Sequence, residues 1–110
     1  EVRRALSRPE GEVELWRERP FEAVIEGRWV SGVFDRVAIL KDGTGRALRA
    51  TIFDYKTEEI PPEEVPRASE RYRAQMGLYR TALAQLLGLE PEAISTKLVF
   101  THPGVVREVS

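Results

Sequence analysis

The chain contains no cysteine, and this absence excludes disulfide bonds and any zinc or iron–sulfur site held by cysteine. It also lacks an apolar run long enough for a membrane span or a signal peptide, so we expect a soluble, cytoplasmic protein without membrane association. Neither charge sign is in clear excess: 17 basic and 18 acidic residues leave a net charge of −1. Any contact with nucleic acid must therefore come from a local groove, a bound metal or a partner domain.

The size and composition are those of one globular domain. The chain has 110 residues, of which 42% are hydrophobic and 32% charged, and this is too short for two domains and too apolar for a disordered segment. It opens at Glu1 without an initiator methionine, inside a stretch that is helical in pattern through Val2, Ala5 and Leu6. We expect residues 1–110 to be a single domain cut from a longer protein.

Hydropathy patterns predict a strand meander, one long helix and one or two returning strands. Pro20 is expected to separate the first two strands, and Gly88 to end the helix. The predicted strands are 12–18, 21–26, 29–40, 47–56, 94–101 and 105–109, with a tight turn at 27–28 and the helix at 67–87. The strands at 29–40 and 47–56 carry hydrophobic residues on both faces, as in strands covered on two sides. The order implies an α/β domain with a mixed sheet.

The turn at 41–46 sets the register of the hairpin around it. Without a bulge, three pairs of residues face each other across the strands: Asp35 and Asp54, Val37 and Ile52, and Val33 and Lys56. Directly opposed residues have Cβ atoms about 5 Å apart. Two carboxylates at that distance among apolar residues repel each other and lose hydration, which a divalent cation with oxygen ligands relieves. Mg²⁺ is the usual occupant of such a site, and Mn²⁺ is a possible substitute.

Asp54 and Lys56 are two residues apart on one strand, so their side chains share a face. The Lys56 ammonium then lies beside the metal carboxylates, where it can orient an attacking water or stabilise charge on a phosphate oxygen. The carbonyl of Tyr55 can complete the metal shell. On the helix, Gln75 and Tyr79 share a face with Tyr72, and an amide with phenols in one place can grip DNA.

Four segments together resemble the core of the PD-(D/E)XK nuclease superfamily, and within it the RecB/AddA-type nuclease domain at the C-terminus of recombination helicases. The segments are Glu18 to Phe21, Gly32 to Val37, Ile52 to Thr57 and Tyr72 to Tyr79. The resemblance implies a restriction-endonuclease-like fold and a Mg²⁺-dependent exodeoxyribonuclease in DNA end processing and recombinational repair. It implies helicase domains in the same chain, and partner subunits. Asp35 and Asp54 would be metal ligands, Lys56 the catalytic lysine, and Gln75 and Tyr79 the family's Q-x-x-x-Y pair near the DNA.

One family feature is missing before Asp35: a histidine that serves as a further metal ligand. His102, the only histidine, can replace it but is expected at an exposed strand end. The absence of cysteine also separates the chain from iron–sulfur relatives. The alternatives are a catalytically incomplete, nuclease-like module that binds DNA or docks, and a phage-type exonuclease of the same superfamily. The acidic loop that holds Glu58, Glu59, Glu63 and Glu64 is expected to be solvated and not a second metal site.

Overall fold

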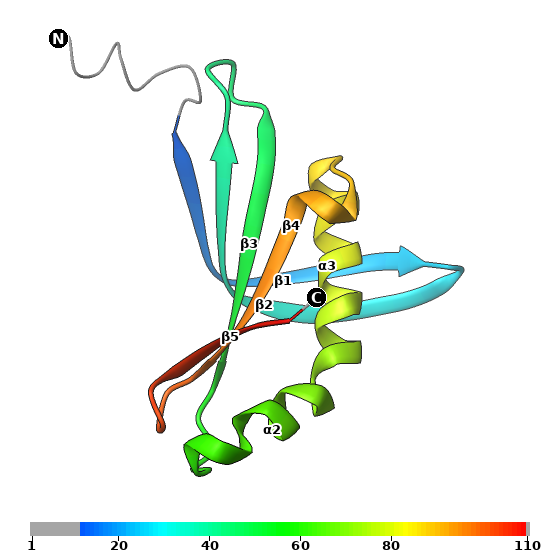
Figure 1. Cartoon of the computed structure of the whole chain (residues 1–110). Helices are drawn as coiled ribbons and strands as arrows, with labels where there is room; N and C mark the ends of the chain where they lie inside the picture. The colour runs from blue at the N-terminus through cyan, green and yellow to red at the C-terminus, as the bar shows by residue number, and fades with distance from the viewer. Residues whose placement is uncertain (1–11, 110) are drawn as a thin grey trace, which may run out of the picture.

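Five strands form one sheet in the order β1-β2-β3-β4-β5, with two helices in the connection from β3 to β4 (Figure 1). The computed structural model describes residues 12–109, so the helical start predicted from Val2, Ala5 and Leu6 lies outside the described residues. The elements are β1 (Val13–Ile25), β2 (Arg28–Lys41), β3 (Ala47–Lys56), η1 (Pro62–Glu64), α2 (Val65–Arg71), α3 (Arg73–Leu87), η2 (Pro91–Ala93), β4 (Ile94–Phe100) and β5 (Val105–Val109). Strands β3 and β4 are parallel and the other neighbours antiparallel. The predicted α/β class with a mixed sheet is confirmed.

Strands β1 and β2 form one long hairpin. Its turn residues are Glu26 and Gly27, with φ of 51° and 77°, the left-handed pair that a two-residue hairpin turn requires. The turn therefore lies one residue earlier than predicted. The expectation that Pro20 ends the first strand was wrong, because Pro20 lies within β1. Strand β1 is the edge of the sheet, where alternate N–H groups face solvent and the missing proline donor costs no hydrogen bond.

The second hairpin is closed by the side chain of Asp42. Its Oδ1 accepts hydrogen bonds from the backbone N–H groups of Thr44 and Arg46, at 2.8 and 3.0 Å. These bonds lower the pKa of Asp42, the largest cause being the additional bond from the Thr44 hydroxyl. The register shifts once, between Leu40 and Lys41. The irregularity lies next to the turn, so the rest of the hairpin keeps one register.

The hydrophobic core lies between the helices and one face of the sheet. Its largest fully buried side chains are Phe34, Val37, Ile39, Ile52, Val65, Met76, Leu83, Ile94, Leu98 and Phe100. On the opposite face of β3, Thr51 and Phe53 are half-buried and Tyr55 is exposed. The prediction that the central strands are covered on both sides was therefore wrong for residues 12–109, in which a single helical layer covers the sheet.

The predicted single helix is two helices, α2 and α3, which meet at Tyr72. Tyr72 has φ −101° and ψ 0° and lies outside both helices, whereas Gly77 is accommodated inside α3. Gly88 ends α3 in a left-handed conformation with φ 70°, as predicted. None of the helices described between residues 12 and 109 combines the length and the hydropathy needed to cross a bilayer.

Candidate active site

The site lies where the β1–β2 hairpin bends away from β3 (Figure 1). Arg17 pairs with Arg36 and Arg19 pairs with Phe34, but the residues between them, Glu18 and Asp35, are left out of the ladder. Glu18 has a left-handed backbone with φ 47°, a conformation that residues other than glycine rarely adopt. The ladder between β2 and β3 ends at the same point, because its last pair joins Arg36 to Phe53. Asp35 thus occupies the bend.

The bend turns the Asp35 carboxylate toward β3. Its Oδ2 accepts a hydrogen bond of 2.9 Å from the backbone N–H of Tyr55. That N–H has no partner on β2 once the ladder has ended, so the carboxylate replaces the missing strand. The N–H and C=O of one strand residue point to the same side, and the Tyr55 carbonyl therefore also faces the Asp35 edge. The Asp35 carboxylate and the Tyr55 carbonyl, two of the three metal ligands predicted from the sequence, therefore lie at the same edge of β3.

The predicted hairpin register is present in the structure. Val37 pairs with Ile52, and the ladder ends at Arg36 with Phe53, one step short of the predicted pair Asp35 and Asp54. The two acid side chains are still neighbours, because Asp35 contributes to the raised pKa of Asp54. The predicted pairing of Val33 with Lys56 was wrong, because β2 has left β3 by that point. Val33 pairs with Pro20 instead and is 45% exposed.

Asp54 is the carboxylate among residues 12–109 whose pKa is raised above its ordinary value. It is 7% exposed, and burial raises its pKa, with the neighbouring Asp35 adding to the rise and Lys56 opposing it. Nζ of Lys56 lies 2.7 Å from Oδ2 of Asp54, an ion pair between side chains that are 16% and 10% exposed. Apart from this ion pair, the buried Oδ2 has no hydrogen-bond partner. A buried oxygen in this state has lone-pair capacity for a further cation.

The donor set fits a hard divalent cation. Two carboxylates and the Tyr55 carbonyl supply oxygen ligands only, and Mg²⁺ is commonly held by one or two carboxylates with water completing its shell. Between residues 12 and 109, no group of three or more His, Cys, Asp or Glu side chains is placed to hold a metal. His102 does not replace the missing histidine ligand, because it is an exposed residue after β4 whose Nδ1 lies 3.8 Å from Oε2 of Glu59. The candidate ligands are therefore Asp35, Asp54 and Tyr55.

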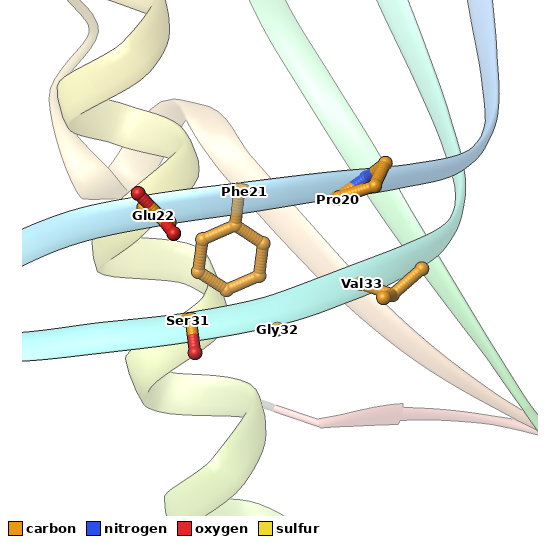
Figure 2. A pocket seen from close by; sticks show the side chains of 6 residues that line it. All are labelled: Pro20, Phe21, Glu22, Ser31, Gly32 and Val33. Atoms are coloured by element: carbon orange, nitrogen blue, oxygen red, sulfur yellow. The ribbon is translucent and has the colours of Figure 1, made fainter.

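A recess of about 250 Å³ opens beside Asp35 and is lined by Arg17, Glu18, Asp35, Arg36 and Tyr55. Sequence reasoning treated Glu18 only as part of the segment leading into the core; the register across the Glu26–Gly27 turn would have placed it opposite Asp35. Nε of Arg36 is buried there without a hydrogen-bond partner. A larger recess of about 530 Å³ lies on the β1–β2 hairpin around Phe21 and Gly32, and none of Asp35, Asp54 and Lys56 lines it (Figure 2).

The helix residues predicted to share a role are in three different environments. Gln75 is exposed on α3. Tyr79 is half-buried, with its ring edge-on to Phe21 and Phe34 at 5.2 and 5.7 Å. Its hydroxyl lies so close to Gly32 that a Cβ at this position would be 2.8 Å away, which explains the glycine. Tyr72 lies over the Lys56 ammonium, 3.9 Å from Nζ to the ring centre. Contact of any of the three with DNA stays a prediction.

Comparison with known families gives a match over nearly the whole chain. The profile of the PD-(D/E)XK nuclease superfamily matches residues 1–109, which include both acids, Lys56 and the three helix residues. A search of curated proteins gave no match. The matched range covers all the elements that build the bend, the hairpin and the helix break.

Proposed function

Because the chain belongs to the PD-(D/E)XK nuclease superfamily, we propose that Asp35, Asp54 and Lys56 are the reaction centre of a metal-dependent deoxyribonuclease. Membership in the superfamily indicates a nuclease, a hydrolase of phosphodiester bonds, and nucleases of this superfamily generally use divalent metals. The finer assignment is an exodeoxyribonuclease domain of the RecB/AddA type, using Mg²⁺ or Mn²⁺. In this assignment it processes DNA ends in recombinational repair, joined to helicase domains and partner subunits in the cytoplasm.

One observation carries the proposal: a buried carboxylate with a raised pKa, Asp54, faces a second carboxylate and contacts a lysine at 2.7 Å. Such an arrangement is costly for a fold and is characteristic of a reaction site. Asp35, Asp54 and the Tyr55 carbonyl would hold the metal. When bound, the metal supplies a Lewis acid that polarises the phosphate and activates water.

The chain's own groups have distinct tasks in hydrolysis. Lys56 presents a positive charge next to the acids, where it orients the attacking water and stabilises negative charge that builds up on a phosphate oxygen. Arg17 and Arg36 line the recess beside Asp35 on the sheet face of Phe53, with which Arg36 pairs, so they add positive charge next to Asp35 and not at Lys56. Burial of Asp54 keeps water from competing for its oxygens.

The second candidate is a nuclease-like module that clamps DNA or docks without cutting it. The observation in its favour is the absence of a third acidic or histidine ligand near the two acids within residues 12–109. A metal titration distinguishes this module from a nuclease, because only a reaction centre needs to bind the cation.

We expect calorimetric titration with Mn²⁺ to show one site that Asp35→Asn abolishes and Glu63→Gln, an exposed acid of the 57–64 loop, leaves intact. The metal needs the Asp54 carboxylate, whose pKa is raised above the ordinary 3.8. Affinity is therefore present above the raised pKa and falls as pH drops through it, by about tenfold per pH unit. Binding that survives Asp35→Asn, or that stays constant down to the ordinary aspartate pKa, would favour the docking module.

A further inference from the structure

The Lys56 side chain is held from two directions by different parts of the fold. Its Nζ contacts Asp54 on its own strand at 2.7 Å, and the ring of Tyr72 at 3.9 Å to the centroid. A lysine has a long flexible stem, and at the last residue of a strand nothing in the backbone restricts its head group. An ammonium over an aromatic face at this distance is attracted by the ring, more strongly where both are shielded from water, and Lys56 is only 16% exposed.

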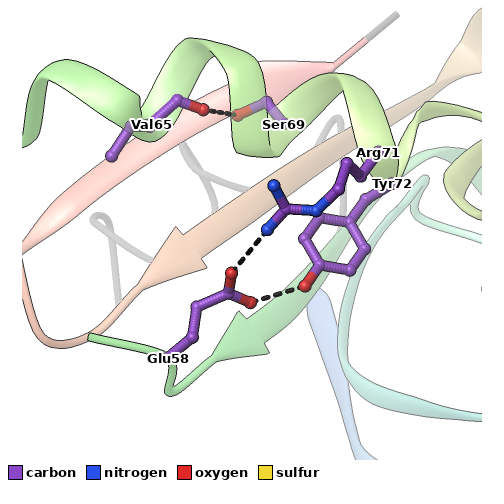
Figure 3. Close-up of polar contacts among 5 residues, drawn as sticks. All are labelled: Glu58, Val65, Ser69, Arg71 and Tyr72. Atoms are coloured by element: carbon purple, nitrogen blue, oxygen red, sulfur yellow. Dashed lines mark hydrogen bonds and ion pairs between the residues drawn. The ribbon is translucent and has the colours of Figure 1, made fainter. Parts of the chain in front are cut away.

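Tyr72 is itself fixed by a carboxylate beyond the end of β3. Its hydroxyl donates a hydrogen bond to Oε1 of Glu58, and Nη2 of Arg71 contacts the other oxygen, Oε2, at 2.9 Å (Figure 3). The bond to Glu58 raises the pKa of the Tyr72 hydroxyl, which therefore remains a neutral phenol. Arg71 is 57% exposed, so its ion pair with Glu58 adds orientation and little stability.

The helix break places the ring in this position. Tyr72 closes α2 through its N–H, which contacts Ser69 O at 3.1 Å, and accepts the bond from Met76 N that starts α3. No glycine or proline stands at the break, so local sequence does not require it. The contacts that distinguish Tyr72 from a residue inside a continuous helix are those to Lys56 and Glu58.

We propose that Tyr72, oriented by Glu58, is a positioning residue that holds the Lys56 ammonium against Asp54. The inference rests on the proposed function of Lys56 and deepens it. It gives Tyr72 a role distinct from contact with DNA, and it gives the neighbouring Glu58 a role other than that of a solvated loop acid.

The test compares Tyr72→Phe, which keeps the aromatic face, with Tyr72→Leu, which keeps apolar bulk alone. In steady-state DNA cleavage by the intact protein, Tyr72→Leu is expected to lower kcat by about tenfold with KM unchanged, the size of a shielded cation–π contact. Tyr72→Phe keeps the ring but loses the hydrogen bond to Glu58, so its kcat is expected to fall by no more than about fivefold, as in Glu58→Ala.

A second readout needs no activity. Nζ of Lys56 lies 3.9 Å from the ring centre, so the NMR signals of the adjoining ε-methylene protons should be shifted upfield in wild type, less so in Tyr72→Phe, and return to ordinary positions in Tyr72→Leu. Glu58→Ala should reduce this shift and lower kcat by up to about fivefold, the effect of one hydrogen bond. Glu59→Ala, at the neighbouring and 83% exposed carboxylate, serves as the matched control and should change neither.

Each outcome gives a decision. If Lys56→Ala is inactive but Tyr72→Leu keeps the wild-type kcat, the positioning role is overturned while the proposed function stands. If the upfield shift behaves as expected but Lys56→Ala cuts normally, the proposed function fails and the contact is structural. Should Tyr72→Leu not fold, the comparison of Glu58→Ala with Glu59→Ala decides: equal shifts and rates in the two contradict the proposal.

Discussion

Replacing Lys56 with alanine is expected to lower the rate of phosphodiester hydrolysis by about 10²–10⁴-fold while the chain remains folded. The ammonium is the only lysine head group that contacts the site acids in the described chain, at 2.7 Å from Asp54. Its loss removes the group that orients water and stabilises charge on the phosphate. Folding should survive because the pKa of Asp54 is already raised, and without its cation the carboxyl can take up a proton.

The measurement is single-turnover cleavage of labelled DNA with Mg²⁺, with circular dichroism as the check on folding. Lys97→Ala is the matched control. Lys97 lies on β4 next to Phe53, on the sheet face opposite the site. The Lys97→Ala variant should therefore cut DNA at the wild-type rate. Cleavage by Lys56→Ala at the wild-type rate would remove the lysine from the reaction.

Replacing Phe34 with alanine is expected to cost about 3–5 kcal/mol of unfolding free energy, the range for a large aromatic deleted from a core. Phe34 is 0% exposed, stacks on Phe21 at 4.3 Å and meets the edge of Tyr79 at 5.7 Å. It precedes Asp35 directly, so this aromatic cluster anchors the bend that aims the carboxylate. Loss of the cluster leaves a cavity in the part of the core that holds the hairpin against α3.

Urea unfolding measures this cost, with Phe53→Ala as the control. Phe53 is the same residue type on the neighbouring strand, but it is half-buried on the face that no described helix covers. Its replacement should cost clearly less. Equal losses in the two variants would show that the cluster around Phe34 contributes no special stability to the bend.

The pairing of the site strands could be predicted because two local signals agree. The Asp-Gly-Thr-Gly turn and the apolar residues on both sides of it fix one register, and Val37 does pair with Ile52. The bulge next to Leu40 did not disturb the prediction, because it lies on the turn side of every pair that matters. The α/β class followed from the order of strands and helix.

The bend and the helix break could not be predicted, because both depend on contacts between distant segments. No residue next to Glu18 in the sequence predicts its left-handed backbone. The conformation occurs where the β1–β2 hairpin bends across α3 (Figure 1). Likewise Tyr72 interrupts a sequence with good helical pattern, and its contacts are with Lys56 at the end of β3 and Glu58 in the loop that follows. Tertiary contacts override local propensity at both places.

The most direct test of a single reaction centre is the cleavage rate of Asp35→Asn, Asp54→Asn, Lys56→Ala and the triple variant, each under single-turnover conditions. Residues that act as one unit show losses that do not add, because removing any one already disables the others. We therefore expect the triple variant to cut no more slowly than the slowest single variant. Losses that multiply across the three positions, or an Asp35→Asn variant that cuts at the wild-type rate, would contradict a shared centre.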